Sequence, residues 1–347
     1  MNETLAGLKR CAEESLPGGQ RSLNCRVCGN TTGNRKYRIA EMMFGTGDVF
    51  EYFECNRCGC LQIAEIPSNL PEFYPQGYYS LEDDPKPHTR FRSFVLKQVC
   101  RYALCGPGPL GGWTYRLLSR RLPTLALLGL TGVRANARIL DVGSGTGRFV
   151  RLLRRGGFAA LGIDPYVSHD ICDSFNAPLV LNRSLHEHCL SCEEKYDVII
   201  FDHSFEHLPD PLAALSATRN LLESRSSATC IIQTPTVSSW AWEHYREHWV
   251  QLDAPRHLHL QSLGSMCLLA SKAGFKVERV LFTSTEFQFW GSEQYRRGVP
   301  LMSDGSYRQG TPLFSRAEIA VFRRRAASLN AAGKGDQAAF FLKPTAV

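Results

Sequence analysis

An apolar segment that runs directly into three closely spaced glycines constrains this fold more than any other feature. In ILDVGSGTGRF, a buried-strand pattern is followed by Gly143, Gly145 and Gly147, and a helix pattern starts at once. Side chains at these glycines would keep the backbone away from a bound nucleoside, and a helix N-terminus accepts polar ligand groups. Asp164 ends the next apolar run, LGID, about twenty residues later, where an acid can bind both ribose hydroxyls. The pattern predicts a nucleoside-binding crevice.

Strand and helix patterns alternate from Ala137 to the end of the chain. Helix-like stretches of about ten residues between strands are typical of a doubly wound, mostly parallel sheet. We therefore predict an α/β fold with a Rossmann-like, seven-stranded, doubly wound sheet over residues 131–347. The expected strands are ARILDV, AALGID, APLVLN, YDVIIFD, ATCIIQTP, GFKVERVLF and AAFFLKP.

Two short cysteine motifs near the N-terminus have the spacing of a zinc ribbon. They are CRVCG, with Cys25 and Cys28, and CNRCG, with Cys55 and Cys58. Four thiolates close a tetrahedral Zn²⁺ site, and a glycine after each second cysteine permits a tight turn. We predict a small zinc ribbon over residues 21–66 with a structural role, because four protein ligands leave no open position. Free thiols are the alternative.

The remaining segments are expected to be a flexible lead-in (1–20), a linker (67–90) and a helical lead-in to the core (91–130). Neither the N-terminal stretch nor the short apolar run at 122–133 resembles an export signal or a membrane span, which predicts a cytoplasmic protein. In that setting thirteen cysteines favour metal binding or free thiols over disulfides. A net charge of +7 indicates either a solvated basic face or an affinity for phosphorylated partners.

The spacing alone does not separate a nicotinamide cofactor from S-adenosylmethionine. However, DVGSGTG, GIDP and YDVIIFDHSFEHLPDP together resemble the class I methyltransferases that act on small molecules. The resemblance implies S-adenosyl-L-methionine as the donor. It also implies that Asp141 and the glycines hold its methionyl end, that Asp164 holds the ribose and that Ser184 is the nearest match to the adenine-binding acid. The segment containing Asp202 and His203 would then lie below the methyl group.

The cysteine motifs followed by LPEFYP resemble deoxysugar methyltransferases, including those that methylate a carbon of a nucleotide-linked sugar. In the segment WVQLDAPRHLHLQS, the resemblance implies that His257 is a catalytic base. His259 is the second candidate, because residues two apart on an extended segment point to the same side. Arg256 stands where that family has an acid, which favours O-methylation of a sugar or nucleotide-linked sugar.

Three other functions stay open: C-methylation of a nucleotide-deoxysugar, methylation of ribosomal RNA, and a non-catalytic nucleotide-binding scaffold. The partner expected is a small-molecule acceptor, with nucleic acid the less favoured choice. HEHCLSC (186–192) is a candidate second metal site, and His207 is expected to fix a helix start. The aromatic residues of SWAWEHYREHW form either a buried helix face or a wall for an acceptor.

Overall fold

The computed structural model describes residues 23–74, 90–106, 115, 122–225 and 227–345. The predicted lead-in, residues 1–20, and most of the predicted linker lie outside these ranges. Among the described residues, no helix combines the length and the apolar character needed to cross a membrane.

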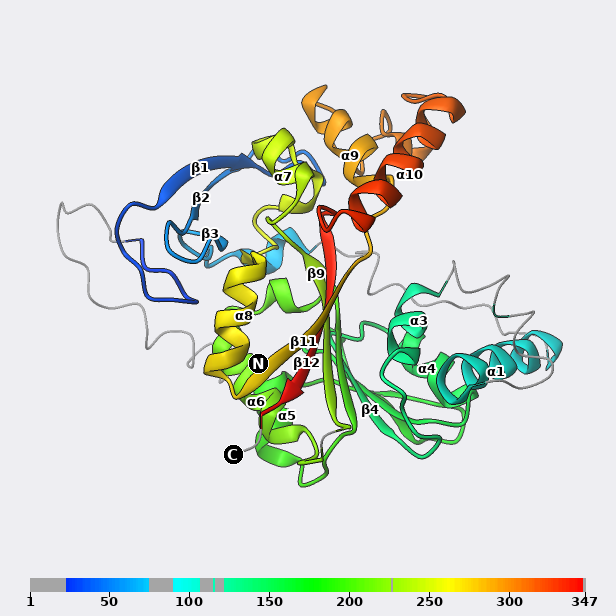
Figure 1. Ribbon diagram of the computed structural model, residues 1–347. Coiled ribbons are helices and arrows are strands. Elements are labelled where there is room, and N and C mark those ends of the chain that lie inside the picture. Colours follow the sequence, from blue (N-terminus) through cyan, green and yellow to red (C-terminus); the bar gives the residue numbers. More distant parts are fainter. Residues whose placement is uncertain (1–22, 75–89, 107–114, 116–121, 226, 346–347) are drawn as a thin grey trace.

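A mixed eight-stranded sheet forms the centre of the described structure, in the order β11-β12-β9-β8-β4-β5-β7-β6 (Figure 1). The strands from β7 to β9 are parallel, whereas β12 runs antiparallel to both of its neighbours. All seven predicted strands are present. The eighth, β6, is a two-residue strand antiparallel to β7 that the sequence did not indicate. The strands are β4 (Arg138–Val142), β5 (Ala159–Ile163), β6 (Ile171–Cys172), β7 (Pro178–Leu181), β8 (Val198–Asp202), β9 (Thr229–Pro235), β11 (Phe275–Phe282) and β12 (Gln337–Pro344).

Helices cover both faces of this sheet (Figure 1). Alternate strand residues point to opposite faces, so Ile139 of β4 packs with Val99 and Val150 on one side. Its neighbour Leu140 belongs to the core on the other side, with Leu215. The first face carries α1 (Arg90–Cys105), α3 (Pro123–Gly129) and α4 (Arg148–Arg155), and the second carries α5 (Leu185–Ser191), α6 (Pro211–Leu221) and α8 (Leu263–Lys272).

A further layer lies beyond the carboxyl ends of the parallel strands (Figure 1). It buries Trp242, Tyr245 and Trp249, and the Trp249 indole donates a 3.0 Å hydrogen bond to Asp336. These aromatic residues are therefore a buried core and not a wall for an acceptor. The layer contains α7 (Trp240–Tyr245), α9 (Phe287–Arg296), α10 (Arg316–Ala331) and the short 3₁₀ turns η5 (Arg246–His248), η6 (Val250–Leu252) and η7 (Tyr307–Gln309).

The N-terminal cysteine motifs belong to a second sheet, which we call the ribbon sheet. Its antiparallel order is β1 (Arg35–Ala40), β2 (Val49–Glu54), β3 (Leu61–Ile63) and β10 (His259–Leu260). The fourth strand comes from the segment that follows β9, far outside the predicted ribbon. Tyr52 and Leu61 accordingly share one buried cluster with Leu258. The ribbon sheet is thus packed into the rest of the chain.

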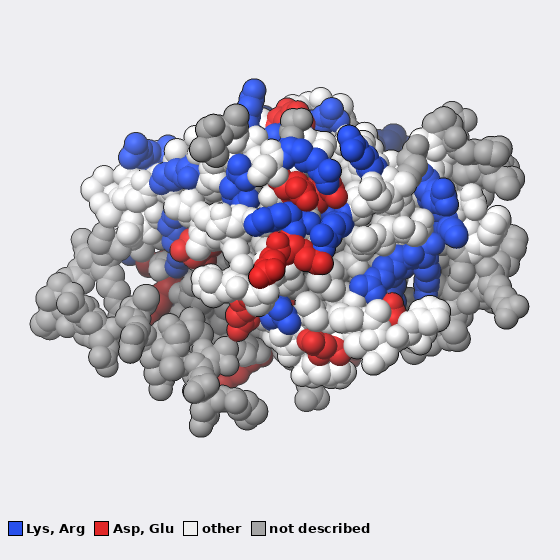
Figure 2. All heavy atoms as spheres, turned by 90° about the horizontal axis from the view of Figure 1, so that it is seen from below, with Lys and Arg blue, Asp and Glu red and all other residues white. Residues whose placement is uncertain are grey.

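The charged side chains are spread over the surface. On the face seen in Figure 2, basic and acidic side chains alternate across the middle, and basic ones gather toward its right-hand side. Several arginines are paired with acids, including Arg154 with Asp173 at 2.9 Å and Arg323 with Glu286 at 2.5 Å. This mixed pattern favours the solvated basic face.

Candidate active site

The glycine-rich loop adopts the conformation that its sequence predicts. Gly143, Gly145 and Gly147 all have positive φ, at 75°, 52° and 77°. A Cβ atom at Gly143 would lie 2.4 Å from the Ser204 side chain, and one at Gly147 would lie 2.6 Å from Val180. Gly143 and Gly147 therefore admit no other side chain without movement of their neighbours.

Three acidic residues lie at or near the carboxyl ends of adjacent parallel strands: Asp141, Asp164 and Asp202. The Asp164 carboxylate accepts hydrogen bonds from the backbone of Gly145 at 2.8 Å and of Tyr166 at 2.9 Å. Burial and the nearby carboxylates of Asp202 and Asp164 raise the pKa of Asp141 well above its usual value. Burial also raises the pKa of Asp164. A buried acidic group of this kind suits a ligand rich in hydrogen-bond donors or carrying positive charge.

A cavity of about 460 Å³ opens beside these acids. Predicted cofactor residues that line it are Gly143, Asp164, Ser184, Asp202 and His203. Asp141, near the end of β4, and the loop residues Gly145 and Gly147 are not among the residues that line it, and Ser184 also caps α5 in a capping box with Glu187. The rings of Tyr74 and Tyr166 stack at its edge, with centroids 5.3 Å apart. The site fits an adenosyl ligand, because strand ends, a glycine loop and a ribose-binding acid meet there.

A second cavity, of about 210 Å³, shares His203 and His207 with the first. The two cavities therefore meet at these histidines. Its other lining residues are Met43, Val250, Gln251, Asp253, His257, Phe287, Tyr295, Leu301, Arg308 and Gln337.

The geometry of His257 leaves one ring nitrogen available at this cavity. Its Nδ1 lies 2.7 Å from the carbonyl oxygen of Gln251. A carbonyl only accepts, so Nδ1 carries the proton and Nε2 is the unprotonated nitrogen of the neutral ring. Burial, with help from nearby His207, lowers the pKa of His257. The neutral, proton-accepting form is therefore favoured near neutral pH.

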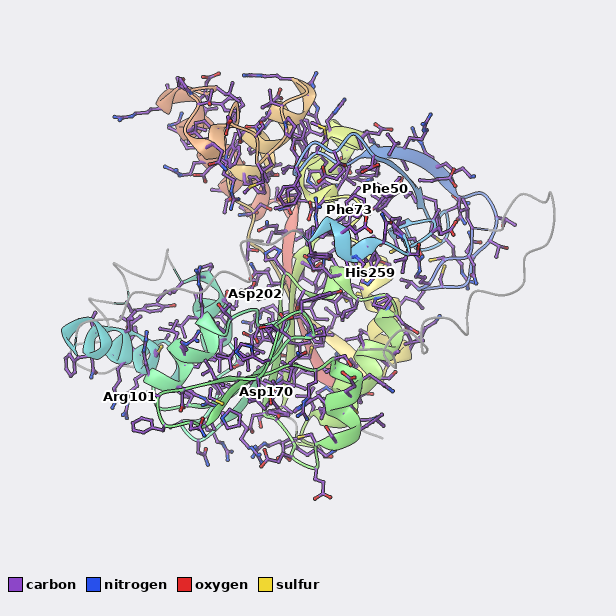
Figure 3. All side chains as sticks on the ribbon, turned by 180° about the vertical axis from the view of Figure 1, so that it is seen from behind. Phe50, Phe73, Arg101, Asp170, Asp202 and His259 are labelled. Atoms are coloured by element: carbon purple, nitrogen blue, oxygen red, sulfur yellow. The ribbon has the colours of Figure 1, made fainter. Side chains whose placement is uncertain are left out.

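His259, the second candidate base, is placed differently. Its Nε2 donates to the carbonyl of Leu208 at 3.0 Å, and its Nδ1 accepts from Gln261 at 3.1 Å. The ring is 1% exposed, and burial lowers its pKa to about 4. Figure 3 shows it on the ribbon side of the main sheet. Both nitrogens are engaged, so the geometry favours a structural tie for His259.

Two residues of the EHLPDP motif join the site although the sequence did not assign them there. His207 donates from Nδ1 to the carbonyl of Arg256 at 2.9 Å, and its ring centroid lies 4.8 Å from that of His257. The helix start is fixed instead by Asp210, whose side chain accepts from the backbone of Ala213. Glu206 is completely buried beside them. The motif itself was the only available signal, because its partners come from the loop near residue 256.

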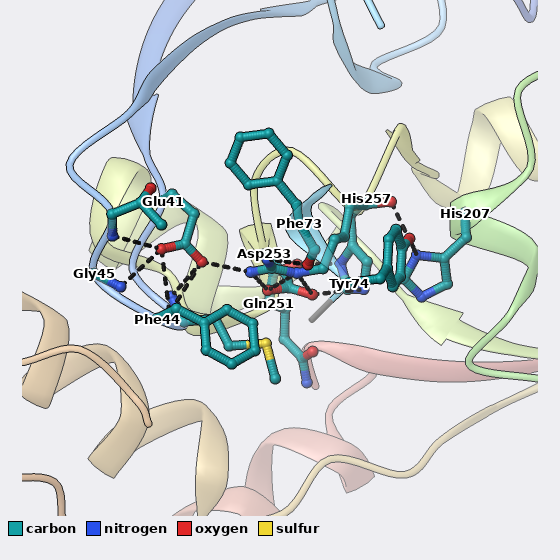
Figure 4. Close-up of polar contacts among 12 residues, drawn as sticks. Glu41, Phe44, Gly45, Phe73, Tyr74, His207, Gln251, Asp253 and His257 are labelled. Carbon is teal, nitrogen blue, oxygen red and sulfur yellow. Dashed lines mark hydrogen bonds and ion pairs between the residues drawn. The ribbon is translucent and has the colours of Figure 1, made fainter. Parts of the chain in front are cut away.

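A buried ion-pair network supports the loop that carries His257. Arg256 donates to Asp253 at 2.6 Å and to Glu41 at 2.8 Å, and also to the carbonyl of Phe73 at 3.1 Å. Glu41 also accepts from the backbone of the turn that follows it, including Gly45 at 2.8 Å. Figure 4 shows this run of contacts extending from Glu41 to His207. Arg256 is thus fully used in holding the loop against the ribbon sheet.

The four predicted metal ligands converge. Their sulfur atoms lie within 4.8 Å of one another, with Cys25 and Cys58 3.5 Å apart and Cys28 and Cys55 3.4 Å apart. Gly29 and Gly59 follow with φ of 75° and 71°. Four sulfur donors in this arrangement fit the tetrahedral coordination of Zn²⁺, which would stabilise the turns without taking part in chemistry.

The second candidate metal site does not assemble. In the described residues, the HEHCLSC segment is not among the clusters whose ligand atoms converge. Its His188 instead pairs with the hydroxyl of Tyr196 at 2.9 Å. For the cysteines whose side chains the structure describes, no disulfide is formed.

A comparison with protein families identifies the class of enzyme. A model described as "Methyltransferase domain" matches residues 112–280, a range that contains the glycine loop, the three acids and His257. The chain contains a methyltransferase domain. The protein is accordingly an S-adenosylmethionine-dependent methyltransferase.

No curated protein matches this methyltransferase. Solved structures resemble it at low identity. A mycolic acid cyclopropane synthase complexed with S-adenosylhomocysteine is 18% identical, covers 75% of this chain and all of its own, and has a TM-score of 0.42. A methyltransferase from Archaeoglobus fulgidus is 17% identical over 74% of this chain and 100% of its own, at 0.39. An O-methyltransferase from a Brevibacillus brevis multienzyme is 12% identical over 71% and 79%, at 0.40.

Proposed function

We propose that this methyltransferase transfers a methyl group to a hydroxyl of a sugar or nucleotide-linked sugar, with His257 as the proton acceptor. One observation carries the proposal: a small cavity with both polar and apolar lining residues adjoins the donor cavity at His203 and His207. At about 210 Å³ it is smaller than the roughly 300–1,000 Å³ of ordinary ligand sites. Such a cavity suits one sugar ring, with the remainder of the molecule outside.

The proposed step needs little from the protein beyond alignment and one base. The acceptor oxygen attacks the methyl carbon, the carbon–sulfur bond breaks, and S-adenosylhomocysteine leaves. Holding donor and acceptor in line supplies most of the acceleration. The hydroxyl proton passes to Nε2 of His257, whose lone pair is free because Nδ1 is held by Gln251.

The basicity of His257 favours oxygen over carbon as the methylated atom. Burial lowers its pKa, and a weakly basic imidazole is poorly matched to the removal of a proton from carbon. A hydroxyl loses its proton as the methyl group arrives, so a weak base suffices.

An acceptor screen tests the proposal. The protein is incubated with methyl-labelled S-adenosylmethionine and with nucleotide-linked sugars, free deoxysugars or ribosomal RNA. The Gly145→Val variant serves as the control that lacks donor binding, because Gly145 has a positive φ of 52°. We expect label in a sugar O-methyl group with the wild type only. Label in RNA alone, or in a sugar carbon, would contradict the proposal.

A further inference from the structure

The most unusual group near the acceptor cavity is the carboxylate of Glu206. The residue lies in η4 (Phe205–His207) and is 0% exposed. Its Oε2 accepts a 2.9 Å hydrogen bond from the hydroxyl of Thr234, whereas its Oε1 is buried and has no hydrogen-bond partner among the residues that the structure describes. A buried carboxylate oxygen without a donor is costly, so this arrangement calls for a functional explanation.

Two histidines face that oxygen from different parts of the chain. Nδ1 of His203, just after β8, lies 3.5 Å from Oε1, and Nε2 of His257 lies 3.8 Å from it. Because Nδ1 of His257 is held by the carbonyl of Gln251, any proton that His257 gains must go to Nε2. The vacant acceptor of Glu206 is therefore aimed at the atom that becomes a donor only after proton transfer.

We propose that Glu206 is a positioning residue that stabilises the protonated form of His257 as the acceptor hydroxyl loses its proton. The inference rests on the function proposed above, in which His257 is the base. An interaction that strengthens only when the imidazolium forms contributes to the transition state and not to the resting enzyme. The Thr234 hydroxyl fixes the other carboxylate oxygen and so limits movement of Oε1.

The surrounding charges are consistent with an anionic Glu206. Burial opposes ionisation, but the close approach of His203 to Oε1 and the neighbouring rings of His257 and His207 lower the pKa of Glu206 to about 2. Glu206 in turn raises the pKa of His203, against the effect of burial. The titratable and charged groups around His257 are Glu206 and His207 from η4, His203 just after β8, Asp253 and Arg256 from its own loop, Glu41 through Arg256, Tyr295 from α9, and Arg308 at the cavity wall.

Histidine-selective ¹⁵N NMR titration of the full-length protein tests the inference directly. The His257 signal is identified by its loss in His257→Gln, and its pKa is then compared between the wild type and Glu206→Gln. Loss of the carboxylate should lower the pKa of His257 by on the order of one unit, the effect of removing a nearby opposite charge. An unchanged pKa in Glu206→Gln would overturn the inference.

Two further variants provide controls. Thr234→Val keeps the charge and removes only the anchoring hydroxyl, so the pKa of His257 should fall by less. Glu206→Asp keeps the charge but withdraws it by one methylene, and should also give a smaller fall. If Glu206→Gln does not fold, Glu206→Asp carries the test, and an unchanged pKa there is equally contradictory.

Kinetics separate positioning from a general structural role. Glu206→Gln should lower kcat roughly tenfold or more with unchanged affinity for S-adenosylmethionine. In a His257→Ala background the same change should have no further effect, because the partner is gone. An equal loss in both backgrounds would overturn the inference.

Metal analysis tests the remaining alternative, in which Glu206 is a metal ligand. The ligand atoms of Glu206, His207 and His257 lie within 4.8 Å of one another, a spacing that also suits a cation. A metal ion bound in addition to the cysteine site and lost in Glu206→Gln would overturn the inference, since Glu206 would then be a ligand. The titration needs neither donor nor acceptor, so its failure is separable from failure of the acceptor screen.

Discussion

The Tyr52 hydroxyl donates a 2.8 Å hydrogen bond to the main-chain carbonyl of His257, although 205 residues separate them. Tyr52 lies on β2 of the ribbon sheet and is completely buried. The same loop is held by β10, which pairs with β3, and by the ion pair between Arg256 and Glu41. The ribbon sheet therefore positions the candidate base as well as carrying the cysteine site.

Removal of the hydrogen bond between Tyr52 and His257 should lower both stability and turnover. Tyr52→Phe leaves the His257 carbonyl without its buried donor, and the free energy of unfolding should fall by about 1–3 kcal/mol. Turnover should fall while donor affinity stays the same, because the donor cavity is not touched. Tyr37→Phe is the matched control, since Tyr37 is the cross-strand partner of Tyr52 but its hydroxyl bonds Glu54 and not the loop. Equal turnover in the two variants would contradict the positioning role.

Loss of metal from the cysteine site should affect both the stability and the activity of the protein. We expect about one zinc ion per chain, lost in the double variant Cys25→Ser/Cys58→Ser. Because strand β10 of the ribbon sheet comes from the segment that carries His257, loss of the metal should also lower activity. Elemental analysis and denaturant unfolding measure both effects.

Cys267→Ser is the control for this prediction, because Cys267 is exposed on α8 and lies outside the cluster. It should retain metal and activity. Zinc content that is undiminished in the double variant would remove the metal site from the account.

Donor binding should depend on Asp164. Asp164→Ala removes acceptors for the ribose and for the backbone of Gly145, so affinity should fall by about 1.5–3 kcal/mol. Asp173→Ala is a suitable control, because its carboxylate also accepts backbone hydrogen bonds, from Phe175 and Ala177, but away from the cavity. Calorimetry with S-adenosylmethionine and NADH measures the difference. Tighter binding of NADH would contradict the donor assignment.

Stability should depend on pH through His259. Its pKa is about 4 in the folded protein, against about 6.5 for an unperturbed histidine. The unfolded chain binds this proton first, so the contribution is fully present above pH about 6.5 and is lost as the pH falls toward 4. Urea unfolding at pH 7.5 and 5 should show a smaller pH effect in His259→Gln than in the wild type. The same pH effect in both proteins would show that His259 does not titrate in this way.

The sequence predicted the main sheet well for a physical reason. Strands such as β4 and β8 are continuous apolar runs because both of their faces are buried, and such runs are visible without a structure. The glycine loop was equally readable, since Gly143 and Gly147 need positive φ and empty space. Strand β6 was missed because two residues carry no periodicity.

The residues around His257 were harder to predict from the sequence, because they come from segments that are distant along the chain. Glu206 and His207 precede α6, whereas His257 lies about fifty residues later, and nothing local links them. His259 was kept as a second candidate beside His257 because alternate residues of a strand share a side. The structure separates them through their partners, the Gln251 carbonyl for one and the Leu208 carbonyl and Gln261 for the other.

The most direct test of the account is the turnover of His257→Ala beside that of His259→Gln, with donor affinity measured in parallel. A positioned base contributes roughly 10²–10⁴ in rate, so His257→Ala should lose that factor and bind S-adenosylmethionine normally. In the wild type, activity should rise with pH as His257 loses its proton. The midpoint of this rise should lie below about pH 6.5, the pKa of an unperturbed histidine, because the pKa of His257 is lowered. Full turnover in His257→Ala would contradict the account.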